Sequence, residues 1–102
     1  MHWILRYTTT NDYLKRRAAF RAAHLQLAWD SVEAGDLLLG GAVGDPPESA
    51  LLLFANEAAA RAFAAADPYV ANGLVARWEV LPWNTVVGEQ AANPVLTHHS
   101  LV

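Results

Sequence analysis

The order in which the hydrophobic pattern changes along this chain constrains its fold more than any other feature. Short apolar runs at residues 3–7, 37–39, 50–55 and 74–81 have the length and composition of β-strands. Between them, residues 12–34 repeat apolar side chains at spacings of three and four, and residues 57–66 are rich in alanine. The predicted order is therefore strand, helix, strand, strand, helix, strand.

This order predicts a ferredoxin-like α+β fold, in which an antiparallel sheet has both helices on one face. The other face of the sheet would then be open and apolar, and it would carry Trp3 or Trp78, depending on the strand register. An exposed apolar face of that size usually marks an interaction surface. We therefore expect two copies to press their open faces together in a symmetric homodimer.

The first helix has a candidate buried stripe and a single histidine beside it. The stripe consists of residues spaced by four and three, namely Ala18, Ala22, Leu25, Trp29 and Val32. His24 lies in the neighbouring row, so we expect it at the edge of the buried face. Thr10 or Asn11 is expected to cap the first turn, and Gly35 is expected to supply the left-handed exit.

The second helix has clear signals at both ends. Asn56 is a favourable N-cap residue immediately before the alanine-rich segment. Asp67 precedes Pro68, and a residue before proline is disfavoured in the helical region, so the helix is predicted to end near Ala66.

Size and charge limit the classes of function. A chain of 102 residues, 54% of them hydrophobic, fits one domain with a substantial core; we assign the domain to residues 1–87 and an irregular tail to residues 88–102. The net charge of −3 argues against nucleic-acid binding. There is no cysteine, no secretory signal pattern and no apolar run near the roughly 20 residues that span a bilayer. We expect a soluble cytoplasmic protein that does not bind membranes.

His24 and Asp67 are the candidate catalytic residues. His24 is the one histidine deep within a predicted element, and imidazole exchanges protons near neutral pH. Asp67 follows the second helix, which is expected to cover the same sheet face, so its carboxylate could orient the imidazole as in other base-plus-orienter pairs. The alternatives are structural: a hydrogen-bonded histidine at a helix edge, and an aspartate that caps the turn beginning at Pro68.

The remaining candidates also have two interpretations each. The backbone amides of Gly40 and Gly41 could approach an anionic group, or the pair could mark a tight strand end. Tyr69 could be a core residue or a phenol lining a pocket. The adjacent His98 and His99 lack carboxylate partners, so we assign no metal, and no cofactor is required.

Five segments together resemble the YCII-related (YciI-like) family over about residues 1–87. They are RAAHL at 21–25, AGDLL at 34–38 with the following Gly40 and Gly41, ADPY at 66–69, ANGL at 71–74 and LPW at 81–83. The resemblance implies a ferredoxin-like subunit that pairs into a dimeric α+β barrel. It also implies an active site built around a His–Asp pair, here His24 and Asp67. Most members have no established reaction, and at least one is a dehydrochlorinase that acts on a chlorinated hydroxylated aromatic.

Two hypotheses of function follow. The first is a small, cofactor-independent dimeric enzyme that uses His24 as general acid–base and Asp67 as its orienter. Its reaction would be an elimination, such as dehydrochlorination, or an isomerisation of a small cyclic or aromatic molecule. Gly40, Gly41 and Tyr69 are its candidate substrate-binding residues. The second is a non-catalytic dimer that binds a small ligand or a partner protein; a monooxygenase-like or haem-handling barrel would share the fold, which by itself does not specify function.

Overall fold

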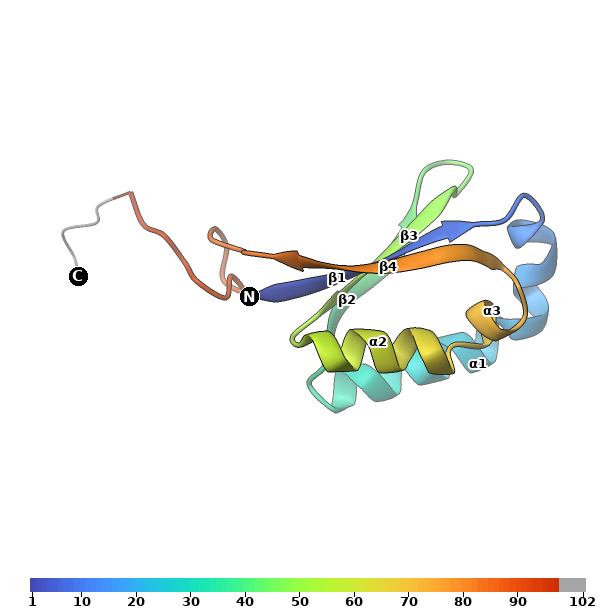
Figure 1. Cartoon of the computed structure of the whole chain (residues 1–102), viewed down its shortest axis with the longest axis horizontal. Helices are drawn as coiled ribbons and strands as arrows, with labels where there is room; N and C mark the ends of the chain where they lie inside the picture. Colours follow the sequence, from blue (N-terminus) through green and yellow to red (C-terminus); the bar gives the residue numbers. More distant parts are fainter. Residues whose placement is uncertain (98–102) are drawn as a thin grey trace.

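The computed structural model of the chain describes residues 1–97, and it confirms the predicted order of strands and helices (Figure 1). A short additional helix, α3, precedes the last strand. His98 and His99 lie outside the described residues. The elements in chain order are β1 (His2–Thr9), α1 (Tyr13–Glu33), β2 (Leu37–Val43), β3 (Ser49–Phe54), α2 (Glu57–Ala66), α3 (Pro68–Ala71) and β4 (Val75–Trp83).

The four strands form one antiparallel sheet in the order β2-β3-β1-β4. Figure 1 shows all three helices on the same side of this sheet, which leaves the other side without a helix. The fold is therefore α+β and ferredoxin-like, as predicted. None of the helices in residues 1–97 is both long and apolar enough to span a bilayer.

The strand register corrects the predicted composition of the open sheet face. Trp3 and Trp78 do not lie there, because β1 and β4 pair Trp78 with the buried Tyr7 and both tryptophans pack against the core. The open face carries instead an ion pair between Arg6 and Glu79. Around this pair lie the apolar side chains that alternate with the core residues, namely Ile4, Leu39, Leu51, Leu53 and Leu81.

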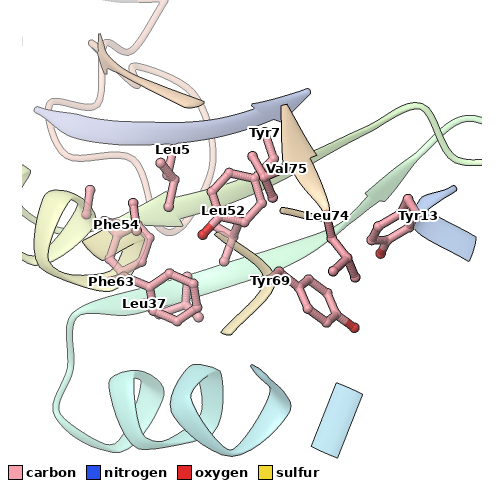
Figure 2. Close-up of a cluster of buried hydrophobic side chains, with 12 residues drawn as sticks. Leu5, Tyr7, Tyr13, Leu37, Leu52, Phe54, Phe63, Tyr69, Leu74 and Val75 are labelled. Atoms are coloured by element: carbon pink, nitrogen blue, oxygen red, sulfur yellow. The ribbon is translucent and has the colours of Figure 1, made fainter. Parts of the chain in front are cut away.

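The core lies between the sheet and the helices. Figure 2 shows Leu5 and Tyr7 projecting from β1 into this layer, where Leu52 and Phe54 of β3 meet Phe63 of α2. All of these side chains are almost completely buried. The core therefore consists of the alternate residues of the central strands, as expected for a sheet covered on one face.

The predicted buried stripe of α1 is wrong. Leu25, Trp29 and Val32 are exposed, and Trp29 retains 64% of its accessible surface. The neighbouring row faces the core instead, since Phe20 and Leu27 pack against it. Alanine and leucine occur on several sides of this helix, so apolar spacing alone does not determine which side faces the core. The large side chains of Phe20 and Leu27 determine it.

The helix ends match their predicted signals in α2 but not at the start of α1. The Asn56 side chain accepts a hydrogen bond from the Ala59 N–H at 2.8 Å, which confirms the N-cap of α2. Gly35 has the expected left-handed conformation, with φ of +81°. At the start of α1, neither Thr10 nor Asn11 is the cap: Asp12 holds that position and makes no side-chain capping bond.

The sequence predicts that β2 ends at the glycine pair, and this prediction is wrong. The pair lies inside β2, which continues to Val43. Gly40 pairs with Leu52 and Gly41 with Leu51 of the adjacent strand. A Cβ atom on Gly40 would lie 3.3 Å from Cγ of Leu52, so the missing side chain allows close packing over this part of the sheet. A Cβ atom on Gly41, by contrast, would meet nothing within 4 Å.

Candidate active site

The structure brings His24 and Asp67 into direct contact, although 43 positions separate them in the sequence. The Nδ1 atom of His24 lies 2.9 Å from Oδ1 and 3.0 Å from Oδ2 of Asp67. His24 projects from α1, and Asp67 occupies the junction between α2 and α3. The two helices lie on the same face of the sheet, and this shared placement explains the contact.

Asp67 is completely buried, with 0% exposure, and both of its carboxylate oxygens are hydrogen-bonded. The Tyr7 hydroxyl donates to Oδ2 at 2.7 Å, and the Tyr69 backbone N–H donates to Oδ1 at 3.0 Å. The second bond is the cap that the sequence predicts for α3. Burial, reinforced by the neighbouring Asp67 carboxylate, raises the pKa of Tyr7 far above its ordinary value, so Tyr7 remains a donor.

The His24 ring is fixed by aromatic neighbours as well as by Asp67. It stacks on the Tyr69 ring with centroids 3.9 Å apart and an interplanar angle of 6°, and it meets Phe63 edge-on at 6.1 Å. With Nδ1–H donated to the carboxylate, the neutral ring carries its free lone pair on Nε2. Among residues 1–97 no side chain hydrogen-bonds Nε2, and no buried polar side-chain atom lacks a partner, so Nε2 is accessible.

His24 lines a cavity of about 460 Å³ between α1 and the edge of the sheet. One wall comes from α1, with Leu25, Ala28, Trp29 and Val32. The opposite wall is formed by residues 37–42 of β2, with Ala50 and Leu52 of β3. Asp67 does not line the cavity; it lies behind His24. Ligand pockets of this size, mostly apolar with a few polar groups, are typical of small-molecule sites.

The three predicted substrate-binding residues all line this cavity. Gly40 and Gly41 contribute backbone to its wall, and the Tyr69 ring forms part of it beneath His24. Tyr69 is also a core residue, with 3% exposure, so the two interpretations of this residue are compatible. Burial is the main cause that raises the pKa of Tyr69, with a smaller rise from Tyr13, while Arg21 and Arg17 act in the opposite direction.

Three residues of the site were not predicted from the sequence. The sequence predicts Tyr7 only as part of a strand, although the hydroxyl of a buried tyrosine needs a hydrogen-bond partner and so points to a polar neighbour. Arg17 and Arg21 line the cavity on the same helix face as His24. Arg21 lies four residues after Arg17 and three residues before His24. This spacing places the three side chains on one side of a helix and is a signal that the sequence contains.

The described residues contain no cluster of three or more His, Cys, Asp or Glu side chains that could hold a metal ion. His2, which lies near the N-terminus, is engaged elsewhere: its Nδ1 is 2.7 Å from the hydroxyl of Thr85. Within residues 1–97 the polar side chains that line the cavity belong to one histidine, one threonine, three tyrosines and two arginines.

Comparison with solved structures supports the fold. A 5-chloro-2-hydroxyhydroquinone dehydrochlorinase from Burkholderia phenoliruptrix, solved in complex with 2,5-dihydroxybenzoquinone, matches with a TM-score of 0.68 and 21% sequence identity. The match covers 83% of this chain and 95% of that chain. No curated protein matches significantly. The model of the YCII-related domain matches residues 1–84, and the chain therefore belongs to the YCII-related family.

Proposed function

We propose that this protein is a small, cofactor-independent enzyme in which His24 acts as general acid–base and Asp67 as its orienter. The observation that carries the proposal is the geometry of the imidazole. One of its nitrogens is bound to a fully buried carboxylate, and the other is accessible beside an apolar cavity. This arrangement holds the imidazole in a fixed tautomer and leaves Nε2 free to exchange a proton with a molecule in the cavity.

The chemistry follows from the proton positions. Nε2 takes a proton from a carbon or hydroxyl of the substrate, and the resulting imidazolium is stabilised by the Asp67 carboxylate. In an elimination, the electron pair released on the substrate forms a new double bond and expels a leaving group such as chloride. In an isomerisation, the imidazolium returns the proton to a different atom of the substrate. Both reactions balance without an oxidant or a metal.

The substrate is proposed to be a small cyclic or aromatic molecule. The cavity volume of about 460 Å³ and its leucine and tryptophan walls suit a single planar ring. The structurally similar dehydrochlorinase acts, by its name, on a chlorinated hydroxylated ring, and its complex contains a dihydroxylated quinone. That likeness supports the same class of molecule here.

We also propose that the protein forms a homodimer through the open face of its sheet. The support is the apolar composition of that face, where Leu39 and Leu51 remain exposed next to the half-buried Leu53. Pairing two copies would remove these side chains from water. The cavity lies mainly on the helix-covered side, and Leu39 of the edge strand borders both the cavity and the proposed interface.

The test uses 5-chloro-2-hydroxyhydroquinone as a probe and measures chloride release. We expect turnover by the wild type, with His24→Gln lowering kcat by about 10²–10⁴ because the proton acceptor is lost. Circular dichroism would verify that the variant remains folded. If His24→Gln releases chloride at the wild-type rate, the acid–base role is wrong. If the wild type binds the probe without converting it, the non-catalytic alternative is favoured.

A further inference from the structure

Two arginines on the cavity wall have no carboxylate partner in the described part of the chain. Arg17 and Arg21 lie on successive turns of α1, on the side that carries His24. Arg17 lies 5.5 Å above the Tyr13 ring, and neither guanidinium hydrogen-bonds or forms an ion pair within residues 1–97. Other arginines do pair with carboxylates, namely Arg6 with Glu79, Arg16 with Asp12 and Arg61 with Glu57.

The cavity is locally cationic in a chain whose net charge is −3. No aspartate or glutamate lines it, and the nearest carboxylate of the site, Asp67, is buried behind His24. Lys15, Arg16, Arg17 and Arg21 all lie in the first half of α1, and of these four only Arg17 and Arg21 line the cavity. A cleft of one sign with apolar walls attracts ligands of the opposite sign.

We infer that the cavity binds a planar organic anion, whose ionised oxygen is held by Arg17 and Arg21 while its ring lies between Trp29 and the leucines of β2. This inference rests on the proposed function of the same site, and it narrows the substrate class. Guanidinium groups bind carboxylates and other oxyanions through charge-assisted hydrogen bonds. The bound oxyanion presents the ring to Nε2 of His24, since all three side chains share one helix face.

The arginines would also assist the reaction. Removal of a proton by His24 increases the electron density on the conjugated ring and its oxygen. Guanidinium groups placed at that oxygen stabilise the developing charge, and such stabilisation is among the largest contributions to catalysis. The ionised oxygen is either a carboxylate on the ring or a ring hydroxyl that has lost its proton, and the two sources share this recognition chemistry.

The test measures binding by isothermal titration calorimetry with matched pairs of probes. Benzoate is compared with neutral benzamide to test a carboxylate, and 4-nitrophenolate with nitrobenzene, at mildly alkaline pH, to test an ionised hydroxyl. We expect at least one anion to bind about tenfold more tightly than its neutral counterpart. The pair that shows the preference identifies the source of the ionised oxygen.

The variants are Arg17→Gln, Arg21→Gln and both together, with Arg61→Gln as the matched control. Arg61 is exposed on α2 and does not line the cavity, so its substitution removes one positive charge without touching the site. Each single variant should lower anion affinity about 3- to 10-fold, the double variant should lose the preference for the anion, and the control should bind like the wild type. Equal binding of anions and neutral probes, equal loss in Arg61→Gln, or no anion binding at about 10 mM would overturn the inference.

The result of the anion-binding test can be distinguished from the result of the chloride-release test. Anion binding that depends on Arg17 and Arg21, in a protein that releases no chloride, would retain the inference and remove the catalytic role. Chloride release that depends on His24, in a protein that binds neutral probes equally well, would retain the enzyme and remove the anion site.

Discussion

Replacing Tyr7 by phenylalanine tests the account of how the site is built. Tyr7 is 1% exposed, and its hydroxyl donates to Oδ2 of Asp67 at 2.7 Å. The substitution removes one oxygen atom and leaves the ring in place. Asp67 then remains fully buried with one donor fewer, while its bonds to His24 and to the Tyr69 N–H are unchanged.

The expected cost follows from this geometry. A hydrogen bond to a charged group contributes about 1.5–3 kcal/mol to stability. When one partner of a buried pair is removed, the other remains buried without its bond, so the whole contribution is lost. The apolar area buried by the ring does not change, so no hydrophobic term offsets the loss. We expect Tyr7→Phe to lower the free energy of unfolding by about 2 kcal/mol. For a chain of about 100 residues this corresponds to a fall in Tm of roughly 10 °C.

The assay is urea and thermal unfolding at neutral pH, with Tyr69→Phe as the matched control. Tyr69 is also a buried aromatic, 3% exposed, but its hydroxyl makes no hydrogen bond within residues 1–97. We expect the control to change the free energy of unfolding by less than about 0.5 kcal/mol. Equal losses in the two variants, or a Tyr7→Phe protein as stable as the wild type, would refute the reasoning.

Alkaline pH gives the same experiment a second readout. Burial raises the pKa of Tyr7 well above its ordinary 10.0, so above pH 10 the unfolded chain releases this proton while the folded chain retains it. Stability from this group is therefore complete below pH 10 and decreases above it, by up to about 1.4 kcal/mol per pH unit. Tyr7→Phe lacks this dependence, so the stability gap between wild type and variant should narrow from pH 9 to pH 11. A constant gap would contradict the assigned burial.

Three further substitutions address the rest of the fold and the site. Asn56→Ala removes the cap of the Ala59 N–H and should lower the free energy of unfolding by about 1 kcal/mol in urea denaturation. Leu51→Glu places a charge on the open sheet face and should convert the proposed dimer to a monomer in light scattering, whereas an unchanged mass would remove that face from the interface. Trp29→Ala, at a side chain that is 64% exposed, should shift Tm little but weaken ring binding severalfold in calorimetry.

Much of the fold could be predicted because its signals are local. The strands and helices differ in hydrophobic period. Element ends are marked by the capping side chain of Asn56, the left-handed Gly35 and the Asp67-Pro68 pair. The rotation of α1 could not be predicted in this way, since apolar residues occur on more than one of its sides. The register that turns Trp3 and Trp78 toward the core depends on pairing between distant strands.

The residues of the site also fall into two groups, those with a local sequence signal and those whose role depends on distant contacts. His24 and Asp67 were identifiable because each is unusual at its position and both belong to segments that resemble one family. Tyr7 was not identified, because its role depends on a contact across 60 positions of the sequence. Arg17 and Arg21 carry no sequence signal, beyond their spacing from His24, that separates them from surface charges, and only the cavity beside them does so.

The placement of the cavity has a consequence for how such proteins diversify. His24, Asp67 and Tyr7 are tied to the interior, where few replacements are tolerated. The wall on α1 is formed instead by Leu25, Trp29 and Val32, whose side chains are exposed. Substitutions there cost little folding energy, so new ligand preferences can evolve around an unchanged proton-transfer apparatus.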